Sequence, residues 1–403
     1  MHILYYHQHF STPQGAAGTR SYEMARRFVR NNHKVTMICG TSEMSNTGLT
    51  GPFIKGQRQG FIDGINVVEF DLPYSNKDHF FKRSITFFRF ALKSILFALT
   101  HKYDLVFATS TPLTAGIPGI AATILRRKPF VFEVRDLWPE LPKKMGVINN
   151  PFILFAMHVL EWLSYHSAKS CIGLSPGIVQ GIQKQGVDCK HISMIPNGCD
   201  IQSMGPIKSY DLNKKNFTAV FAGAHGIANG LDKVLDAAAV LNKMGRHDIR
   251  IEFIGDGKLK QDLQKRAIHE KLDNCVFHDP IPKTELIKVL KRADIGLMIL
   301  ANIPAFYYGT SPNKFFDYIA CGLPVINNYP GWLADLITEN QCGCAVPPDN
   351  PELLARALVA LLDHPIRLKK MGLNSRALAE KMFDRDMLAE KWIAWVEQTY
   401  VSI

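Results

Sequence analysis

The segment SPNKFFDYIACGLPVI, residues 311–326, combines a helix start with side chains suited to a nucleotide. Ser311 can accept a hydrogen bond from a first-turn N–H group and so cap a helix, and Gly322 predicts where that helix ends. Unpaired N–H groups at a helix start attract phosphate, and Lys314 adds a positive charge there. Asp317, about one turn further along, could accept hydrogen bonds from ribose hydroxyls. The alternative is an ordinary capped helix.

Two other loops bring small residues to an expected helix start. The first is PQGAAGTRSYE, residues 13–23, where Gly15 and Ala16 let the backbone approach a ligand closely. It does not contain G-x-G-x-x-G, so a dinucleotide fingerprint is absent. The second is FAGAHGIANGLDK, residues 221–233, where glycines lead into a helix and His225 could bond a phosphate. A single histidine is more often structural, so that alternative stays open.

The segment EVRDLWPEL, residues 133–141, gathers charge at the end of an expected strand. Glu133, Arg135, Asp136 and Glu140 are the candidate catalytic or acceptor-positioning residues, because charged residues that follow a strand in an α/β fold usually line its ligand site. A surface loop with local ion pairs is the alternative.

Several other chemistries are excluded by spacing. The chain has no G-x-S-x-G and no Walker loop. Its eight cysteines form no C-x-x-C pair, so we expect buried thiols and no metal site. The DRD at 384–386 is interpreted as a helix cap.

Strand-like and helix-like patterns alternate along the whole chain, which predicts parallel sheets covered by helices. The alternation forms two series, so we expect an α/β fold with two Rossmann-like, doubly wound domains facing a crevice. The predicted domains are 1–205 and 206–385, with 386–403 as a helix that returns to the N-terminal domain.

The net charge of +11 lies mostly in residues 1–205, which carry +9. This asymmetry suggests an anionic partner, either nucleic acid or a membrane. The N-terminus lacks a basic region and a cleavage site, so we expect no signal peptide. Glycines and prolines interrupt the uncharged run 105–125, so we expect no membrane span there.

The expected helix 80–100 carries a narrow basic stripe and a wide apolar face. Lys82, Arg89 and Lys93 belong to the stripe, while phenylalanines and leucines fill the remainder. This pattern is typical of a helix lying in a membrane interface. The alternative is a helix packed on the sheet, with its cationic side chains reaching outward.

The chain resembles the GT-B glycosyltransferases of the retaining family 4 type over nearly its whole length. The resemblance rests on GAAGTRSYEMARRFVRNNHKVTMI, IPNGCD, LDKVLDAAAVL, IEFIGDG and SPNKFFDYIACGLPVI, in that order. RDLWPE and the last of these segments look like the subgroup that builds bacterial O-antigens and capsules, notably the N-acetyl-L-fucosaminyl transferase-like enzymes.

The resemblance implies a UDP-sugar donor, a lipid-linked (undecaprenyl-diphosphate) saccharide acceptor, transfer with retained configuration, and no cofactor or metal. It also implies a cytoplasmic protein held at the inner membrane face through helix 80–100, without nucleic acid. The implied donor site comprises Gly15, Ala16, Arg20, Gly223, His225, Asn229, Gly255, Ile281, Ser311, Asn313, Lys314 and Asp317.

Three positions depart from the family pattern. Gly309 stands where the first Glu of the family's E-x7-E motif is expected, and Arg135 replaces the usual catalytic-loop His. Asn229 occupies a position near which a Lys is common, with Lys233 further on. The missing Glu suggests a deoxy or N-acetylated sugar. A non-hydrolysing UDP-sugar 2-epimerase of the same fold is the alternative function.

Overall fold

The computed structural model describes residues 1–75 and 78–401, and their contacts divide the chain into two compact units. The first unit comprises Met1–Pro196, Gly309–Ser311 and the chain from Asp386 onward. The second comprises Asn197–Tyr308 and Pro312–Arg385.

The first unit is built on an eight-stranded sheet with the order β3-β4-β2-β1-β5-β6-β7-β8. The strands are β1 (His2–Tyr6), β2 (Lys34–Ser42), β3 (Gln57–Ile62), β4 (Ile65–Tyr74), β5 (Leu105–Thr109), β6 (Phe130–Val134), β7 (Ser170–Gly173) and β8 (Ile192–Met194). All of these pairings are parallel except the one between β3 and β4.

The prediction of parallel sheets is confirmed, with the exception of the antiparallel edge strand β3. Asp63 and Gly64 both have positive φ and join β3 to β4 in a tight hairpin. No strand was predicted at 57–62, because an exposed edge strand needs little apolar surface and QRQGFI lacks a clear apolar alternation.

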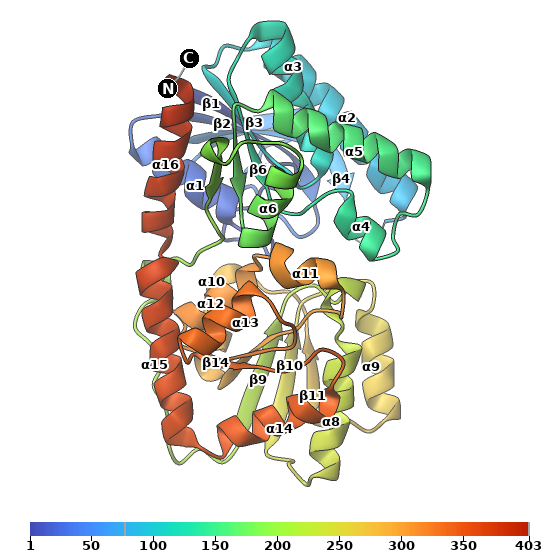
Figure 1. Ribbon diagram of the computed structural model, residues 1–403, viewed down its shortest axis with the longest axis vertical. Helices are drawn as coiled ribbons and strands as arrows, with labels where there is room; N and C mark the ends of the chain where they lie inside the picture. Colours follow the sequence, from blue (N-terminus) through green and yellow to red (C-terminus); the bar gives the residue numbers. More distant parts are fainter. Residues whose placement is uncertain (76–77, 402–403) are drawn as a thin grey trace. The chain divides into compact units, whose positions relative to one another are not determined.

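Helices cover this sheet on both faces. They are α1 (Arg20–Arg30), α2 (Phe80–Thr100), α3 (Ile117–Arg126), α4 (Glu140–Lys144), α5 (Pro151–Ser167), α6 (Pro176–Lys184) and α16 (Arg385–Val401), with short 3-10 helices at Leu113–Gly116 and Cys189–His191. Within this unit α3 lies between α2 and α5 and contacts both (Figure 1).

The C-terminal helix α16 contributes to the core of the first unit through Trp392, which is fully buried. Its ring lies 4.8 Å from that of Phe107, 5.5 Å from that of Phe28 and 6.1 Å from that of Tyr5. Asp386 pairs with Arg27 on α1 at the start of the same helix. Strand β1 and helix α1 therefore hold the last helix by aromatic packing and an ion pair.

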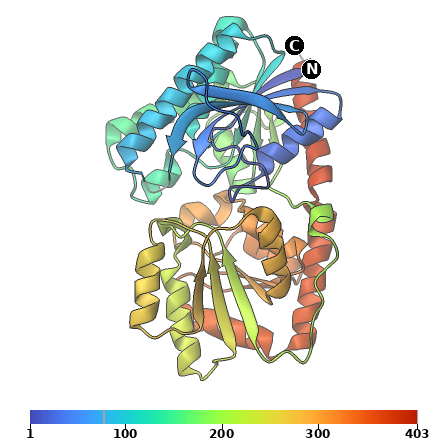
Figure 2. The same ribbon diagram turned by 180° about the vertical axis from the view of Figure 1, so that it is seen from behind.

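The second unit has a six-stranded parallel sheet with the order β11-β10-β9-β12-β13-β14 and helices on both faces (Figure 2). Its strands are β9 (Phe217–Ala222), β10 (Ile249–Ile254), β11 (Cys275–His278), β12 (Ile295–Met298), β13 (Val325–Asn327) and β14 (Gly343–Ala345). Its helices are α7 (Ile201–Met204), α8 (Asp232–Lys243), α9 (Lys260–His269), α10 (Lys283–Arg292), α11 (Pro304–Gly309), α12 (Asn313–Ala320), α13 (Trp332–Glu339), α14 (Pro351–Leu362) and α15 (Pro365–Met382), with a 3-10 helix at Ile227–Asn229.

Two local predictions need correction. Helix α12 begins at Asn313 with Pro312 at the cap position, so Ser311 is not the N-cap. Cys189 is exposed, so the eight cysteines are not all buried. The predicted end at Gly322 is confirmed, since this residue follows the helix with φ of +76°. Among the helices of the described residues, none is both long enough and apolar enough to cross a membrane.

Candidate functional site

In the second unit, two glycine loops meet at the carboxyl ends of β9 and β10. Gly223 follows β9 with φ of +154° and Gly255 follows β10 with φ of +145°. A Cβ on Gly255 would lie 2.0 Å from the Gly223 carbonyl oxygen, and one on Gly257 would lie 2.6 Å from the His225 backbone. Only glycine allows this backbone contact, so the loops form one closely packed edge.

His225 lies on this edge with both of its ring nitrogens unpartnered. The side chain is fully buried, and neither nitrogen has a hydrogen-bond partner within residues 1–75 and 78–401. Its burial lowers the pKa to about 4, and the charge of Lys260 acts in the same direction. The imidazole is therefore neutral at physiological pH. Because an unsatisfied buried polar group is costly, the geometry favours a ligand at this position.

Lys314 brings an amino group from α12 to the same loop. Its Nζ atom donates to Asn229 Oδ1 at 2.8 Å and lies 4.0 Å from the centroid of the Phe221 ring. A Cβ on Gly223 would lie 3.3 Å from that nitrogen. Burial lowers the pKa of Lys314 to about 7. The structure thus brings Asn229 and Lys314 together beside Gly223, on the edge that carries His225, although 85 residues separate Asn229 from Lys314.

Tyr318 fixes the position of α12 against the sheet. Its hydroxyl accepts a hydrogen bond from the Ala222 amide at 2.8 Å, at the last residue of β9. Gly296 in β12 makes room for the ring, because a Cβ there would lie 2.5 Å from Tyr318 Cγ. The N-terminus of α12, with Asn313 and Lys314, is thereby fixed relative to the Gly223 loop.

Asp317 is buried and forms an ion pair through Oδ2 with Lys283 at the start of α10. The sequence analysis missed Lys283. Lys283 directly follows the predicted strand end HDPIP, and this position could have marked it as a site residue. Its pairing with Asp317 could not be predicted, because the two residues lie 34 positions apart in the sequence. Ile281, the predicted base site, lines a cavity of about 450 Å³ beneath α10 with Ile254 and His278.

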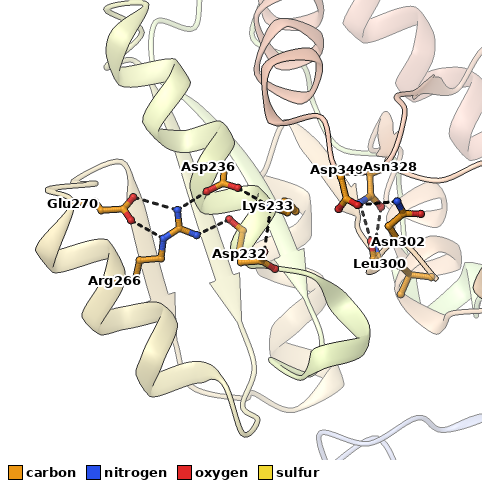
Figure 3. Close-up of polar contacts among 9 residues, drawn as sticks. All are labelled: Asp232, Lys233, Asp236, Arg266, Glu270, Leu300, Asn302, Asn328 and Asp349. Atoms are coloured by element: carbon orange, nitrogen blue, oxygen red, sulfur yellow. Dashed lines mark hydrogen bonds and ion pairs between the residues drawn. The ribbon is translucent and has the colours of Figure 1, made fainter. Parts of the chain in front are cut away.

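Lys233 lies at the start of α8 among carboxylates (Figure 3). Its Nζ atom is 3.2 Å from Asp236 and 3.6 Å from Asp232. Arg266 on α9 joins the same group by pairing with Asp236 and Glu270. These acidic partners satisfy Lys233, whereas Lys314 beside the Gly223 loop has no carboxylate partner among the described residues.

Paired amides hold the ends of β12 and β13 together (Figure 3). Asn328 Oδ1 accepts from the Leu300 amide at 2.9 Å, and Asn328 Nδ2 donates to the Leu300 carbonyl at 2.8 Å. Asn302 donates to Asp349 at 2.8 Å. These bonds order the loop that follows β12 on the edge where the candidate site lies.

In the first unit, the loop at Gly15 does not offer the predicted phosphate cradle. The Gly15 amide donates to the Thr12 carbonyl, and those of Ala16 and Ala17 donate to the Met44 carbonyl. Helix α1 begins only at Arg20. These amides are already satisfied by backbone carbonyls, so the predicted phosphate binding by Gly15 and Ala16 does not fit this loop conformation.

Arg20 and Glu133 form a buried ion pair. Arg20 donates from Nη2 to Glu133 Oε2 at 2.8 Å and from Nη1 to the Pro196 carbonyl, while Thr109 donates to Glu133 Oε1 at 3.1 Å. Both side chains are almost fully buried. Contrary to the sequence prediction, Arg20 is therefore not available to a donor phosphate, and Glu133 positions the strand end rather than contacting an acceptor.

The remaining predicted acceptor residues follow β6. Arg135 and Asp136 are partly buried, and Glu140 is exposed at the start of α4. Burial raises the pKa of Asp136, and the charge of Arg135 opposes this. The Arg135 amide donates to Ser110 Oγ at 2.9 Å, which ties this loop to the end of β5.

The sequence analysis missed His7 and Gln8, which follow β1. Both side chains are buried; His7 Nδ1 and both amide atoms of Gln8 lack hydrogen-bond partners in the described chain. Burial, reinforced by the charge of Arg135, holds the pKa of His7 well below its usual range. The signal was present, because polar residues directly follow the strand HILYY.

Two family models match consecutive parts of the chain. The Glycosyltransferase Family 4 model matches residues 17–203, and the Glycosyl transferases group 1 model matches residues 207–378. The chain is 22% identical over 343 residues to the probable glycosyltransferase WbjE of Pseudomonas aeruginosa, covering 81% of this chain and 83% of WbjE. It is 23% identical over 175 residues to O-antigen chain mannosyltransferase C of Escherichia coli, covering 43% and 44%.

Solved structures of glycosyltransferases share the fold. Sucrose-phosphate synthase from Thermosynechococcus elongatus aligns over 100% of both chains with a TM-score of 0.77 and 15% identity. Anabaena HepE in complex with UDP-glucose aligns over 100% of both chains with a TM-score of 0.69 and 18% identity. WaaG, a glycosyltransferase of lipopolysaccharide biosynthesis, covers 97% of this chain and 98% of its own, with a TM-score of 0.69 and 16% identity. These likenesses confirm the predicted GT-B arrangement of two Rossmann-like domains.

Proposed function

Because the chain consists of a family 4 glycosyltransferase domain followed by a group 1 glycosyltransferase domain, we propose that it transfers a sugar from a UDP-sugar to a lipid-linked saccharide in O-antigen or capsule synthesis. The names of its relatives support the pathway, and the HepE complex with UDP-glucose supports the donor class. The observation that carries the proposal is the cluster of Gly223, His225 and Lys314, where a partly buried amino group lies beside a buried imidazole that has no hydrogen-bond partner among the described residues.

In this proposal the donor diphosphate lies against the Gly223 loop and the first turn of α12. Neutral His225 donates one N–H to a phosphate oxygen, and Lys314 supplies the positive charge that Lys233 cannot supply. Asp317 accepts from the ribose hydroxyls through Oδ1 while Lys283 holds Oδ2. His225, Lys314 and the first turn of α12 thus stabilise the negative charge that develops on the departing phosphate. We expect this electrostatic stabilisation to be the main source of catalysis.

We propose transfer with retained configuration and without a metal. The bond between the anomeric carbon and the phosphate oxygen breaks, and its electron pair stays on UDP. The acceptor hydroxyl bonds to the anomeric carbon on the same face, and its proton passes to the departing phosphate oxygen. Asp136, with its raised pKa, and Glu140 position the acceptor. An N-acetylated 6-deoxyhexose such as L-FucNAc is the first donor sugar to test, because Gly309 offers no carboxylate to a ring hydroxyl.

The donor proposal is tested by thermal shift of the full chain against UDP, GDP and a panel of UDP-sugars. UDP is expected to raise the melting temperature, because a ligand that binds only the folded state stabilises it. Asp317→Asn should abolish the shift, whereas Asp335→Asn, an exposed carboxylate on α13, should retain it. Lys283→Met removes the ion pair but leaves the Asp317 carboxylate in place. Comparison of the UDP shift in this variant with that in Asp317→Asn therefore distinguishes loss of ribose binding from loss of the ion pair. No shift with any nucleotide would overturn the proposed donor site.

We also propose that α2 contacts the cytoplasmic face of the membrane. Phe81, Phe88 and Leu96 are more than half exposed. Helix α2 itself contains no acidic residue, and Asp78, just before it, pairs with Lys82 at 2.7 Å. Exposed aromatic side chains with a basic surround suit an anionic bilayer. Flotation with phosphatidylglycerol vesicles should recover the protein, and Phe81→Ser/Phe88→Ser should reduce that recovery. Equal recovery of this variant would refute the contact.

A further inference from the structure

A pocket of about 550 Å³ lies in the first unit between α4, α5 and α6 and shares Glu140 with the acceptor residues proposed above. Figure 1 shows α4 and α6 beneath α5 in this unit. The pocket begins in the loop after β6 at Leu137, the residue directly after Asp136. Its lining comprises Leu137, Trp138, Pro139, Glu140, Lys143, Lys144, His158, Glu161, Gly181, Lys184 and Gln185.

Unpaired donors surround this pocket. Lys143, Lys144 and Lys184 line it from solvent-exposed positions, and none of them forms an ion pair with another described residue. Trp138 Nε1 is buried there without a hydrogen-bond partner in the described chain. Three exposed ammonium groups, together with one buried indole N–H that has no acceptor among the described residues, can donate to the oxygen atoms of a phosphate group.

The carboxylates of the pocket oppose this charge only in part. Glu140 is exposed to solvent, while Glu161 is buried and accepts from the Tyr165 hydroxyl at 2.9 Å. Gln185 Nε2 and His158 Nδ1 lie 3.4 and 3.5 Å from Glu161 Oε2. Burial raises the pKa of Glu161 to about 7, and the charge of Glu140 acts in the same direction. Glu161 is thus partly protonated at neutral pH, and the three lysines leave the pocket positive.

An apolar row on α5 borders the pocket. Phe152, Phe155, Val159 and Trp162 follow one another at helical spacing and are exposed, and Phe152 retains 82% of its accessible surface. The pocket residues His158 and Glu161 belong to the same helix. The exposed Ile124 and Leu125 of α3 extend the apolar surface, because α3 packs against α5.

We propose that this pocket binds the phosphate of a polyprenyl phosphate carrier, with the isoprenoid chain lying along the apolar row of α5. The inference rests on the proposed lipid-linked acceptor and names its site. The order along the first unit is Asp136, then the basic pocket, then the apolar row. This order corresponds to the saccharide, phosphate and lipid parts of such an acceptor.

The test uses flotation of the full chain with three vesicle compositions. These are phosphatidylcholine alone, phosphatidylcholine with phosphatidylglycerol, and phosphatidylcholine with undecaprenyl phosphate at equal negative charge. We expect at least about tenfold tighter binding to the undecaprenyl phosphate vesicles than to the phosphatidylglycerol vesicles, the amount that one charge-assisted hydrogen bond supplies. A general preference for anionic headgroups would give equal binding to both and overturn the proposal.

Matched variants locate the site. Lys144→Gln/Lys184→Gln should lose the preference for undecaprenyl phosphate and keep the binding to phosphatidylglycerol. Lys34→Gln/Lys55→Gln removes the same charge from exposed positions outside the pocket and should keep the preference. An unchanged preference in the pocket variant would overturn the assignment.

A soluble competitor separates the lipid from free phosphate. Inorganic pyrophosphate at a concentration equal to that of undecaprenyl phosphate should leave vesicle binding unchanged, because it lacks the chain that the apolar row would hold. Complete displacement would assign the pocket to free phosphate instead. Stabilisation by UDP, measured on the same variants, reports on the donor site alone. Failure of the proposed function and failure of the carrier site therefore give different results.

Discussion

Replacement of Lys314 by methionine should stabilise the unliganded protein and weaken nucleotide binding at the same time. The fall of the Lys314 pKa from 10.5 to about 7 corresponds to about 5 kcal/mol of lost preference for the charged form. Lys314→Met removes this cost and should therefore raise the free energy of unfolding, by up to about 5 kcal/mol below about pH 7.

The pH dependence of the free energy of unfolding should reflect the same lowered pKa of Lys314. Between about pH 7 and pH 10.5 the folded protein binds fewer protons at Lys314 than the unfolded chain does. The wild-type free energy of unfolding should therefore rise with pH across this window through Lys314, and the variant should lack that contribution. Below about pH 7 the site is charged in both states and the destabilisation is largest.

Nucleotide affinity should move in the opposite direction. Loss of a charge-assisted contact of about 1.5 to 3 kcal/mol weakens UDP binding by about 10- to 100-fold. Bound diphosphate favours the charged amine, so wild-type affinity should fall as pH rises above about 7. UDP itself is fully ionised in that range, because phosphate monoesters titrate near about pH 6.

Titration calorimetry with UDP between about pH 7 and pH 9, together with thermal melting, measures both effects. Lys243→Met, an exposed lysine at the end of α8, is the matched control and should bind UDP as the wild type does. Wild-type affinity with an unchanged pH slope in Lys314→Met would refute the reasoning.

Three further predictions concern the first unit. Trp392→Ala should lower the free energy of unfolding by about 3 to 5 kcal/mol in urea titrations, because it empties a buried aromatic site; a loss below about 1 kcal/mol would contradict the packing of α16. Arg20→Met should cost about 3 to 5 kcal/mol by leaving the Glu133 carboxylate buried without its partner, and adding Glu133→Leu should recover much of that loss. Between about pH 4.5 and pH 7 the folded protein binds a proton at Glu161 that the unfolded chain has lost, so the wild-type free energy of unfolding should fall by about 3 kcal/mol as pH rises. Glu161→Gln should lack this fall. Parallel pH profiles of the free energy of unfolding for wild type and Glu161→Gln would contradict that assignment.

The candidate donor site was largely predictable because its parts are local motifs at strand ends. Gly223 and Gly255 follow apolar runs that form β9 and β10. Gly322 predicted the end of α12, and the helix ends there. The start of α12 was less predictable. Ser311 has the residue type of a cap, but the chain enters the helix only at Asn313.

The first unit shows where residue type alone misleads. Gly15 and Ala16 are small residues before a helix, yet the Gly15 amide bonds to the Thr12 carbonyl and the Ala16 amide to the Met44 carbonyl, about 30 residues away. Arg20 and Glu133 carry charges suited to a substrate, yet each satisfies the other inside the core. Neither arrangement can be predicted from neighbouring residues, because the partners come together only when separate segments of the chain pack in the fold.

The sequence by itself determined the two series of strands and helices, the glycine loops, the basic amphipathic character of α2 and the residue types available at each strand end. These features follow from the spacing of residues near one another along the chain. Only the tertiary structure decided that Lys314 lies beside Asn229, that Lys283 pairs with Asp317 and that Lys143, Lys144 and Lys184 surround one pocket. The physical reason is that burial and charge pairing depend on which elements pack together, and the packing of distant segments is a property of the whole fold.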